Sequence, residues 1–160
     1  IVHPRVRGDF YRGPIRMEAF SYAAAHTKLP LCYNGDLTTP QACRDLAAAF
    51  PHLQGLMVGR GLVANPALIR EAKGGPPLTK GELQAFHDRL LEDYRSVLSG
   101  DRPVLGKMKE LWFYMSCLFT NPDKYRKGMR KAKHLAEYTQ AVTALFRDQD
   151  LIPGGGFRPD

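Results

Sequence analysis

The chain has 160 residues, 44% of them hydrophobic, which is enough to fill the core of one ordinary domain or two small ones. Its 23 Lys and Arg against 16 Asp and Glu give a net charge of +7, which favours a polyanionic partner, nucleic acid first. No apolar run approaches the roughly 18 residues needed to cross a bilayer, so we expect no membrane partner. A complete eight-stranded β/α barrel needs on the order of 250 residues, so this chain is too short to contain one.

The cysteines are an odd number without CxxC spacing: Cys32, Cys43 and Cys117. Each lies in an apolar or helical pattern, so we interpret them as buried thiols of a reducing compartment and expect no metal site. The first residues, Ile1-Val2-His3-Pro4-Arg5, lack the pattern of a signal peptide. These observations predict a cytoplasmic protein.

The first 75 residues alternate short apolar runs with helical patterns. Residues 1–5 resemble the end of a strand, and further short strands are expected to end at Asn34 and at Val58. Helices are expected at 17–26, 40–50 and 62–72. The second is expected to be capped by Thr38 or Thr39, and the last to be interrupted near Pro66. The order β, α, β, α, β, α predicts three βα units, with a parallel sheet covered by helices.

Two of these strands end in glycine turns, Asn34-Gly35-Asp36 and Gly59-Arg60-Gly61. If the strands are parallel, both turns open on the same edge of the sheet. Glycine lets a phosphate approach the backbone, and Arg60 adds a positive charge and a fork of donors, so the turns predict an anion site. The alternative is purely structural: the glycines make tight turns and Asp36 caps a helix.

His3 stands at the end of the first strand, on the expected edge of the two turns. There it would contact the polar rim of a ligand. A single histidine can equally be a hydrogen-bonded structural residue.

Residues 76–149 begin within a linker, Gly74-Gly75-Pro76-Pro77, after which helical patterns alternate with short turns. A capping box of Thr79 and Glu82 is expected to begin the first helix, and the others are expected at 104–119, at 123–131 and up to about 147. This predicts a four-helix bundle with short loops. Residues 150–160 contain three consecutive glycines and predict a loose, flexible tail.

Six of the ten residues from 124 to 133 are Lys or Arg. On one continuous helix, Arg126, Arg130 and Lys133 would share a face with Lys127 and Lys131 beside it, and such a face suits a phosphate backbone. The alternative is an ordinary solvated helix surface.

Taken together, several motifs resemble tRNA-dihydrouridine synthases in order and spacing. They are Val2-His3-Pro4-Arg5 with Phe10-Tyr11-Arg12-Gly13, Tyr33-Asn34-Gly35-Asp36, and Leu56-Met57-Val58-Gly59-Arg60-Gly61-Leu62. The helical stretch after residue 76 also resembles the C-terminal domain of that family. The resemblance covers about residues 1–147 and implies the last three βα units of an incomplete TIM barrel, at 1–75, followed by a helical tRNA-binding domain at 76–149.

The resemblance implies FMN as cofactor, NADPH as hydride donor and tRNA as the substrate whose uracil 5,6 double bond is reduced. By matching position, His3 would face the flavin ring. The ribityl phosphate would be held by Asn34, Gly35, Asp36, Gly59 and Arg60. The tRNA-binding residues would be Arg126, Lys127, Arg130, Lys131 and Lys133.

The family's catalytic cysteine lies in an Asn-x-Gly-Cys-Pro motif, which this sequence does not contain. We therefore assign no catalytic residue and expect the chain to be inactive alone. The uncovered sheet edges lead us to expect that it needs the missing barrel half or a self-association partner. Two alternatives stay open: a non-catalytic RNA-binding module with a remnant half-barrel, and another FMN barrel acting on a small metabolite.

Overall fold

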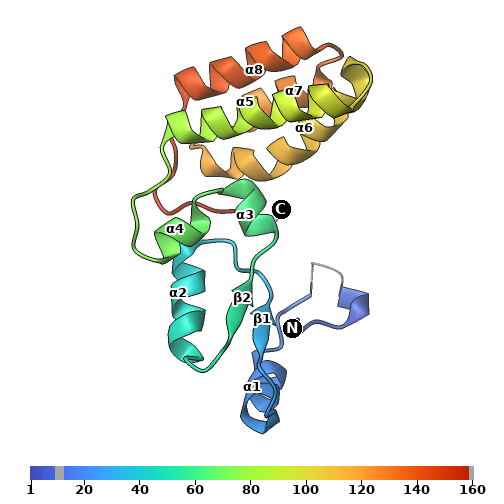
Figure 1. Ribbon diagram of the computed structural model, residues 1–160. Helices are drawn as coiled ribbons and strands as arrows, with labels where there is room; N and C mark the ends of the chain where they lie inside the picture. Colours follow the sequence, from blue (N-terminus) through green and yellow to red (C-terminus); the bar gives the residue numbers. More distant parts are fainter. Residues whose placement is uncertain (10–12, 159–160) are drawn as a thin grey trace.

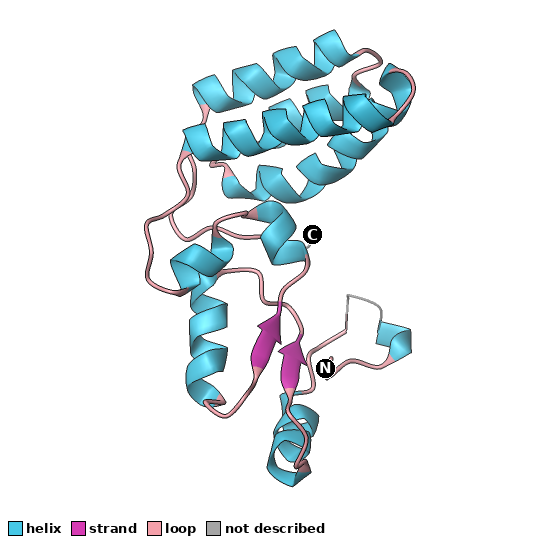
Figure 2. Cartoon of the chain, in the orientation of Figure 1, coloured by secondary structure: helices cyan, strands magenta, loops and turns pink. Residues whose placement is uncertain are grey.

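The computed structural model describes residues 1–9 and 13–158, which form a mostly helical chain with a two-stranded parallel sheet (Figures 1 and 2). The Phe10-Tyr11-Arg12 part of the family-like motifs lies outside the described residues. Among the described residues, no helix has both the length and the apolar character that a membrane span needs.

The sheet pairs β1 (Cys32–Asn34) with β2 (Gly55–Met57) in parallel, with Tyr33 opposite Leu56. Val2 forms a further parallel bridge to Tyr33, through hydrogen bonds of 2.9 Å to both Cys32 and Asn34. The parallel order of the three expected strand segments is therefore confirmed, although the first is only a single bridge. Their membership in a barrel stays a prediction.

Helices η1 (Arg7–Asp9), α1 (Met17–His26), α2 (Pro40–Ala49), α3 (Arg60–Ala64) and α4 (Leu68–Ala72) accompany this sheet. The hydroxyl of Thr39 caps α2 by accepting a 3.1 Å hydrogen bond from the amide of Ala42. A small hydrophobic core, here called the sheet cluster, joins the strands to their helices. Its buried members are Phe20, Tyr33, Leu37, Cys43 and Leu68.

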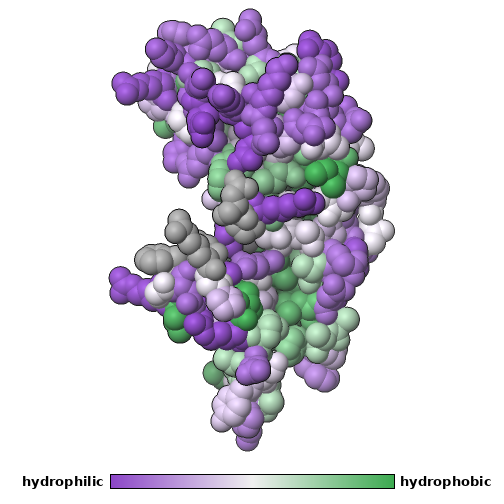
Figure 3. Space-filling view, turned by 180° about the vertical axis from the view of Figure 1, so that it is seen from behind, coloured by the Kyte–Doolittle hydropathy of each residue, from purple (hydrophilic) through white to green (hydrophobic). Residues whose placement is uncertain are grey.

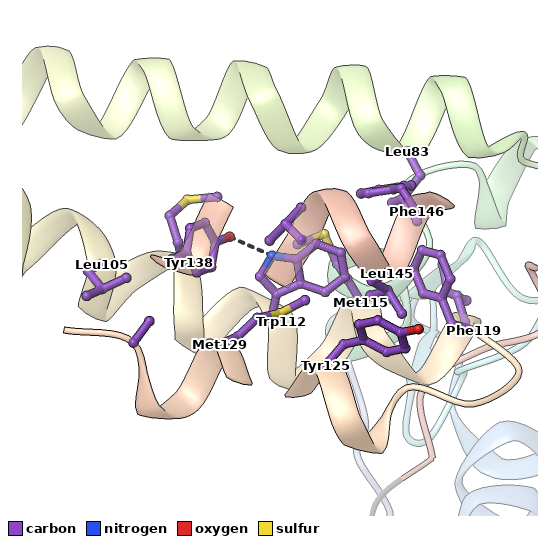
Figure 4. Packing of buried hydrophobic residues seen from close by; sticks show 14 of the residues in the cluster. Leu83, Leu105, Trp112, Met115, Phe119, Tyr125, Met129, Tyr138, Leu145 and Phe146 are labelled. Carbon is purple, nitrogen blue, oxygen red and sulfur yellow. Dashed lines mark hydrogen bonds between the residues drawn. The ribbon is translucent and has the colours of Figure 1, made fainter. Parts of the chain in front are cut away.

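The second part consists of α5 (Lys80–Val97), α6 (Asp101–Met115), η2 (Ser116–Leu118), α7 (Asp123–Lys131) and α8 (Leu135–Asp148). The expected capping box begins α5: the Thr79 hydroxyl accepts from the Glu82 amide, and the Glu82 carboxylate accepts from the Thr79 amide. These helices enclose a larger core, here called the helical cluster, with Trp112 and Met115 near its centre (Figure 4).

Helix α6 begins at Asp101, three residues before the expected start at residue 104, so that Pro103 lies in its first turn. Proline is tolerated there because the amides of a first helical turn have no intrahelical acceptor. The expectation of three buried thiols is wrong in part, since Cys43 is buried but Cys32 and Cys117 are half-buried.

The prediction of a loose tail at residues 150–160 is wrong for its described part. Leu151 pairs with Phe119 in an antiparallel bridge, and the Ile152 amide donates a 2.7 Å hydrogen bond to the carbonyl of Leu118. Phe157 is only 3% exposed. The segment is ordered because its backbone forms hydrogen bonds with residues 118–120 and because its one aromatic side chain is buried. The glycine-rich composition gave no indication of these contacts.

Candidate anion-binding site

The two glycine turns open on the same edge of the sheet because β1 and β2 are parallel and in register to their last residues, Asn34 and Met57. They enclose a pocket of about 210 Å³. All six residues that we expected to bind the cofactor line it. The lining residues are His3, Asn34, Gly35, Asp36, Leu37, Thr38, Met57, Gly59, Arg60 and Gly61.

Glycine is required at two positions of this pocket. Gly35 has a φ of +150°, and an added Cβ would lie 2.9 Å from the side chains of Ile15 and Tyr33. An added Cβ at Gly61 would run into the backbone of Leu37 and Thr38. Gly59 differs, because nothing lies within 4 Å of the position of its missing Cβ. Gly59, which also lines the pocket, is therefore not covered by another atom at this point.

The polar centre of the site is the carboxylate of Asp36. It accepts hydrogen bonds of 2.6 and 2.8 Å from Arg5, and one of 2.7 Å from Nη2 of Arg60. The side chains of Arg5 and Arg60 are 6% and 21% exposed. Two guanidinium groups and one carboxylate leave this triad with a net charge of +1.

Hydrogen bonding to Arg5 lowers the pKa of Asp36 below its usual value, more than partial burial raises it. Asp36 is therefore an anion at neutral pH and repels a second anion. Its carboxylate suits a role in orienting the two arginines, and direct contact of that carboxylate with a phosphate is disfavoured. Asp36 lines the pocket, and its side chain holds Arg5 and Arg60. Its predicted contact with the ribityl phosphate stays a prediction.

Sequence reasoning missed two residues of the site. Arg5 lies within the Val2-His3-Pro4-Arg5 motif, two residues after His3, and that spacing was the available signal. Phe157 lies outside every motif, yet the guanidinium carbon of Arg60 is 5.4 Å from the centre of its ring. A lone phenylalanine in a glycine-rich segment was the only sign of this contact.

A second feature is a groove of about 630 Å³ between α6 and α7. It is lined on α7 by Arg126, Lys127 and Arg130, and on α6 by Lys109 and Phe113 among others. Phe113 is 47% exposed. Three of the five basic residues that we expected to bind nucleic acid therefore line one groove beside an exposed aromatic ring.

The other two basic residues lie apart from the groove lining. Lys131 is the last residue of α7 and is exposed. Lys133 comes after the helix has ended at Ala132, and its amide donates to the carboxylate of Glu137. The expectation that Lys133 shares a helical face with Arg126 and Arg130 is wrong, because α7 is two residues too short.

Comparison with known proteins identifies the family. Residues 1–150 match the sequence profile described as dihydrouridine synthase (Dus). A probable tRNA-dihydrouridine synthase of Rhodobacter capsulatus is 29% identical over 157 residues, covering 92% of this chain and 40% of the relative. The tRNA-dihydrouridine synthase B of Pseudomonas putida is 30% identical over 153 residues, covering 91% and 44%.

The tRNA-dihydrouridine(16) synthase of Pseudomonas syringae pv. tomato is 34% identical over 93 residues, which cover 52% of this chain and 28% of the relative. This chain thus spans less than half the length of each of these relatives. Because the family profile matches almost the whole chain, from the first strand segment through α8, the chain belongs to the dihydrouridine synthase family.

Proposed function

We propose that this chain carries the phosphate end of the FMN site, and part of the tRNA-binding surface, of a tRNA-dihydrouridine synthase. The observation that carries the proposal is the convergence of Asn34, Gly59 and Arg60 on one pocket. In this proposal the three βα units are the last of a TIM barrel, which is completed by residues outside this chain or by a partner.

The pocket fits a phosphate group by charge and by space. The triad of Arg5, Asp36 and Arg60 has a net positive charge, and the backbone at Gly59 is open to a ligand. At about 210 Å³ the pocket is smaller than the roughly 300–1,000 Å³ of complete ligand sites. It therefore suits one end of the cofactor, the ribityl phosphate, and His3 at its rim would face the remainder.

Bound FMN would supply the hydride that reduces the 5,6 double bond of a uracil in tRNA, with NADPH as the source of that hydride. The residues of this chain would bind and orient. Arg60 would donate hydrogen bonds to the phosphate, and Asn34 would offer its side-chain amide at the end of β1. No residue of the chain is assigned the proton transfer.

Flavin binding by the complete protein that contains these residues tests the site. Arg60→Met, and more strongly Arg60→Met with Asn34→Ala, is expected to weaken the binding of FMN but not that of riboflavin, which lacks the phosphate. Arg44→Met is the matched control, because Arg44 lies on the outer surface of α2 and contacts Gln41 and Glu71. Undiminished FMN binding in the double variant would refute the site.

The basic groove supports a second part of the proposal, contact with the sugar-phosphate backbone of tRNA. Figure 3 shows hydrophilic side chains gathered over the helical part on the face opposite to that of Figure 1, with apolar side chains gathered over the sheet part. Lys127 and Arg130 offer charges for phosphates, and Phe113 offers a ring on which a base can stack. If the complete protein does not bind flavin, the basic groove favours instead a non-catalytic RNA-binding module.

Titration with tRNA at rising salt tests this part. Lys127→Glu with Arg130→Glu is expected to weaken binding and to flatten the dependence of log K on log salt. Lys28→Glu with Lys73→Glu makes the same change of charge on exposed residues of the sheet part. Equal effects of the two double variants would mean that net charge, and not the groove, determines binding.

A further inference from the structure

The C-terminal segment, residues 150–157, joins the helical part to the glycine turns. It leaves α8, pairs beside Phe119 and runs toward α3 (Figure 1). The match to the family profile ends at residue 150, so residues 151–157 of this segment lie beyond it.

The end of this segment lies directly against the pocket. Gly156 is packed so closely on Thr38, a pocket-lining residue, that an added Cβ would overlap the Thr38 carbonyl oxygen. Only glycine permits this approach. The next residue, Phe157, is thereby fixed beside the second glycine turn.

The ring of Phe157 is held by α6 on one side. Its centre is 5.0 Å from the ring of Tyr114 and 5.7 Å from that of Phe113. On the other side lies Arg60, whose guanidinium carbon is 5.4 Å from the ring centre. The ring therefore couples the helical part to the one arginine that we assign to the phosphate.

Contacts with Asp36 and Phe157 help to hold Arg60 in place. Asp36 accepts a hydrogen bond from its Nη2 atom, and Phe157 offers a π face that attracts the cation. A free arginine side chain loses much conformational freedom when it is fixed on a ligand, so a guanidinium that is already oriented binds a phosphate more tightly.

We propose that Phe157 is a positioning residue for the cofactor phosphate, acting through Arg60. This inference rests on the proposed FMN site. If Phe157 has this role, the affinity for FMN depends on the C-terminal segment.

The test compares FMN with riboflavin in the complete protein, by flavin fluorescence titration. Phe157→Leu keeps an apolar side chain against Phe113 and Tyr114 but removes the π face. It is expected to weaken FMN binding about 3- to 30-fold and to leave riboflavin binding unchanged. Phe157→Tyr keeps the ring and is expected to retain the affinity for FMN. In an Arg60→Met background, Phe157→Leu is expected to have no further effect.

Phe146→Leu is the matched control, because Phe146 is also a buried phenylalanine, 7% exposed, but packs on Trp112 and Phe119 in the helical cluster. The compared quantity is the ratio of the affinity for FMN to that for riboflavin. If the wild type prefers FMN and Phe157→Leu lowers this ratio no more than Phe146→Leu does, Phe157 has no positioning role, while the phosphate site itself stands. If the wild type binds FMN and riboflavin equally, the phosphate site itself is wrong, and the role of Phe157 falls with it.

Discussion

The carboxylate of Asp36 accepts a 2.7 Å hydrogen bond from Arg60, which comes from the other glycine turn. The same carboxylate is held by Arg5, from the segment after the first strand bridge. One side chain thus ties together the ends of all three parallel segments. It does so from a left-handed backbone conformation, with a φ of +46°, which residues other than glycine, asparagine and aspartate rarely adopt.

Substitution of Asp36 separates its charge from its backbone conformation. Asp36→Asn keeps a residue that tolerates positive φ but removes the ion pairs, and we expect a loss of about 1–2 kcal/mol because Arg5 is nearly buried. Asp36→Ala also adds the strain of positive φ, about 1 kcal/mol more. Urea unfolding at neutral pH measures both losses. Equal stability of the two variants would show that the backbone conformation costs nothing there.

The two glycines of the second turn offer a matched pair of alanine variants. Gly61→Ala forces a Cβ into the backbone of Leu37 and Thr38, so we expect the free energy of unfolding to fall by about 1–3 kcal/mol. Gly59→Ala meets no atom within 4 Å and is expected to change stability by less than about 0.5 kcal/mol. Because Gly59 lines the pocket, the added methyl group is expected to hinder a bound phosphate, so FMN binding should weaken in a stable protein. Thermal unfolding and flavin titration together distinguish the two effects, and tight FMN binding by Gly59→Ala would argue against a phosphate over this turn.

The parts that the sequence predicted are those with local signals. The cap of α2 by Thr39 and the capping box of Thr79 and Glu82 follow from contacts between residues three positions apart. The common edge of the two glycine turns followed from parallel pairing, which the alternation of strands and helices had already indicated. The composition of the pocket was predictable for the same reason.

The missed contacts join residues that are distant in sequence. Arg60 and Phe157 are 97 positions apart, and no spacing pattern links them. The position of Lys133 was mispredicted for a different reason: the charged pattern continued past the point at which the chain leaves the helix at Ala132. Charge alone does not mark a helix end.

Glycines in exposed helix surfaces offer a stabilising change. Gly106 lies in α6 with no heavy atom within 4 Å of its missing Cβ, so Gly106→Ala should raise the free energy of unfolding by about 0.5–1 kcal/mol. Gly128 in α7 faces Ala141 of α8, with 3.4 Å between the added and existing Cβ atoms. Gly128→Ala is expected to gain less, because the two helices would have to give way. Thermal unfolding of both variants checks this, and a larger gain at Gly128 would contradict the close packing of α7 on α8.

The helical cluster contains a buried polar chain. The indole of Trp112 donates a 2.5 Å hydrogen bond to the hydroxyl of Tyr138, drawn as the dashed line in Figure 4. That hydroxyl lies 2.7 Å from Nε2 of His87, whose Nδ1 is 2.8 Å from the carboxylate of Asp88. Because burial raises the pKa of Tyr138, the phenol keeps its proton and donates it to Nε2, so His87 is neutral with its own proton on Nδ1.

Acid is therefore expected to destabilise the helical part through His87. Burial lowers the pKa of His87 below its ordinary value of about 6.5, so the unfolded chain binds the proton more readily than the folded one. Stability from this residue is complete above about pH 6.5 and is lost as the pH falls from there toward the folded-state pKa. We expect His87→Gln to have a lower free energy of unfolding than the wild type at pH 7.5. Between pH 7.5 and 5.5 that free energy should fall less in the variant than in the wild type, as measured by urea unfolding. His52→Gln, at an exposed position, serves as the control and should leave the decrease unchanged; an equally steep decrease in His87→Gln would place the acid-sensitive group elsewhere.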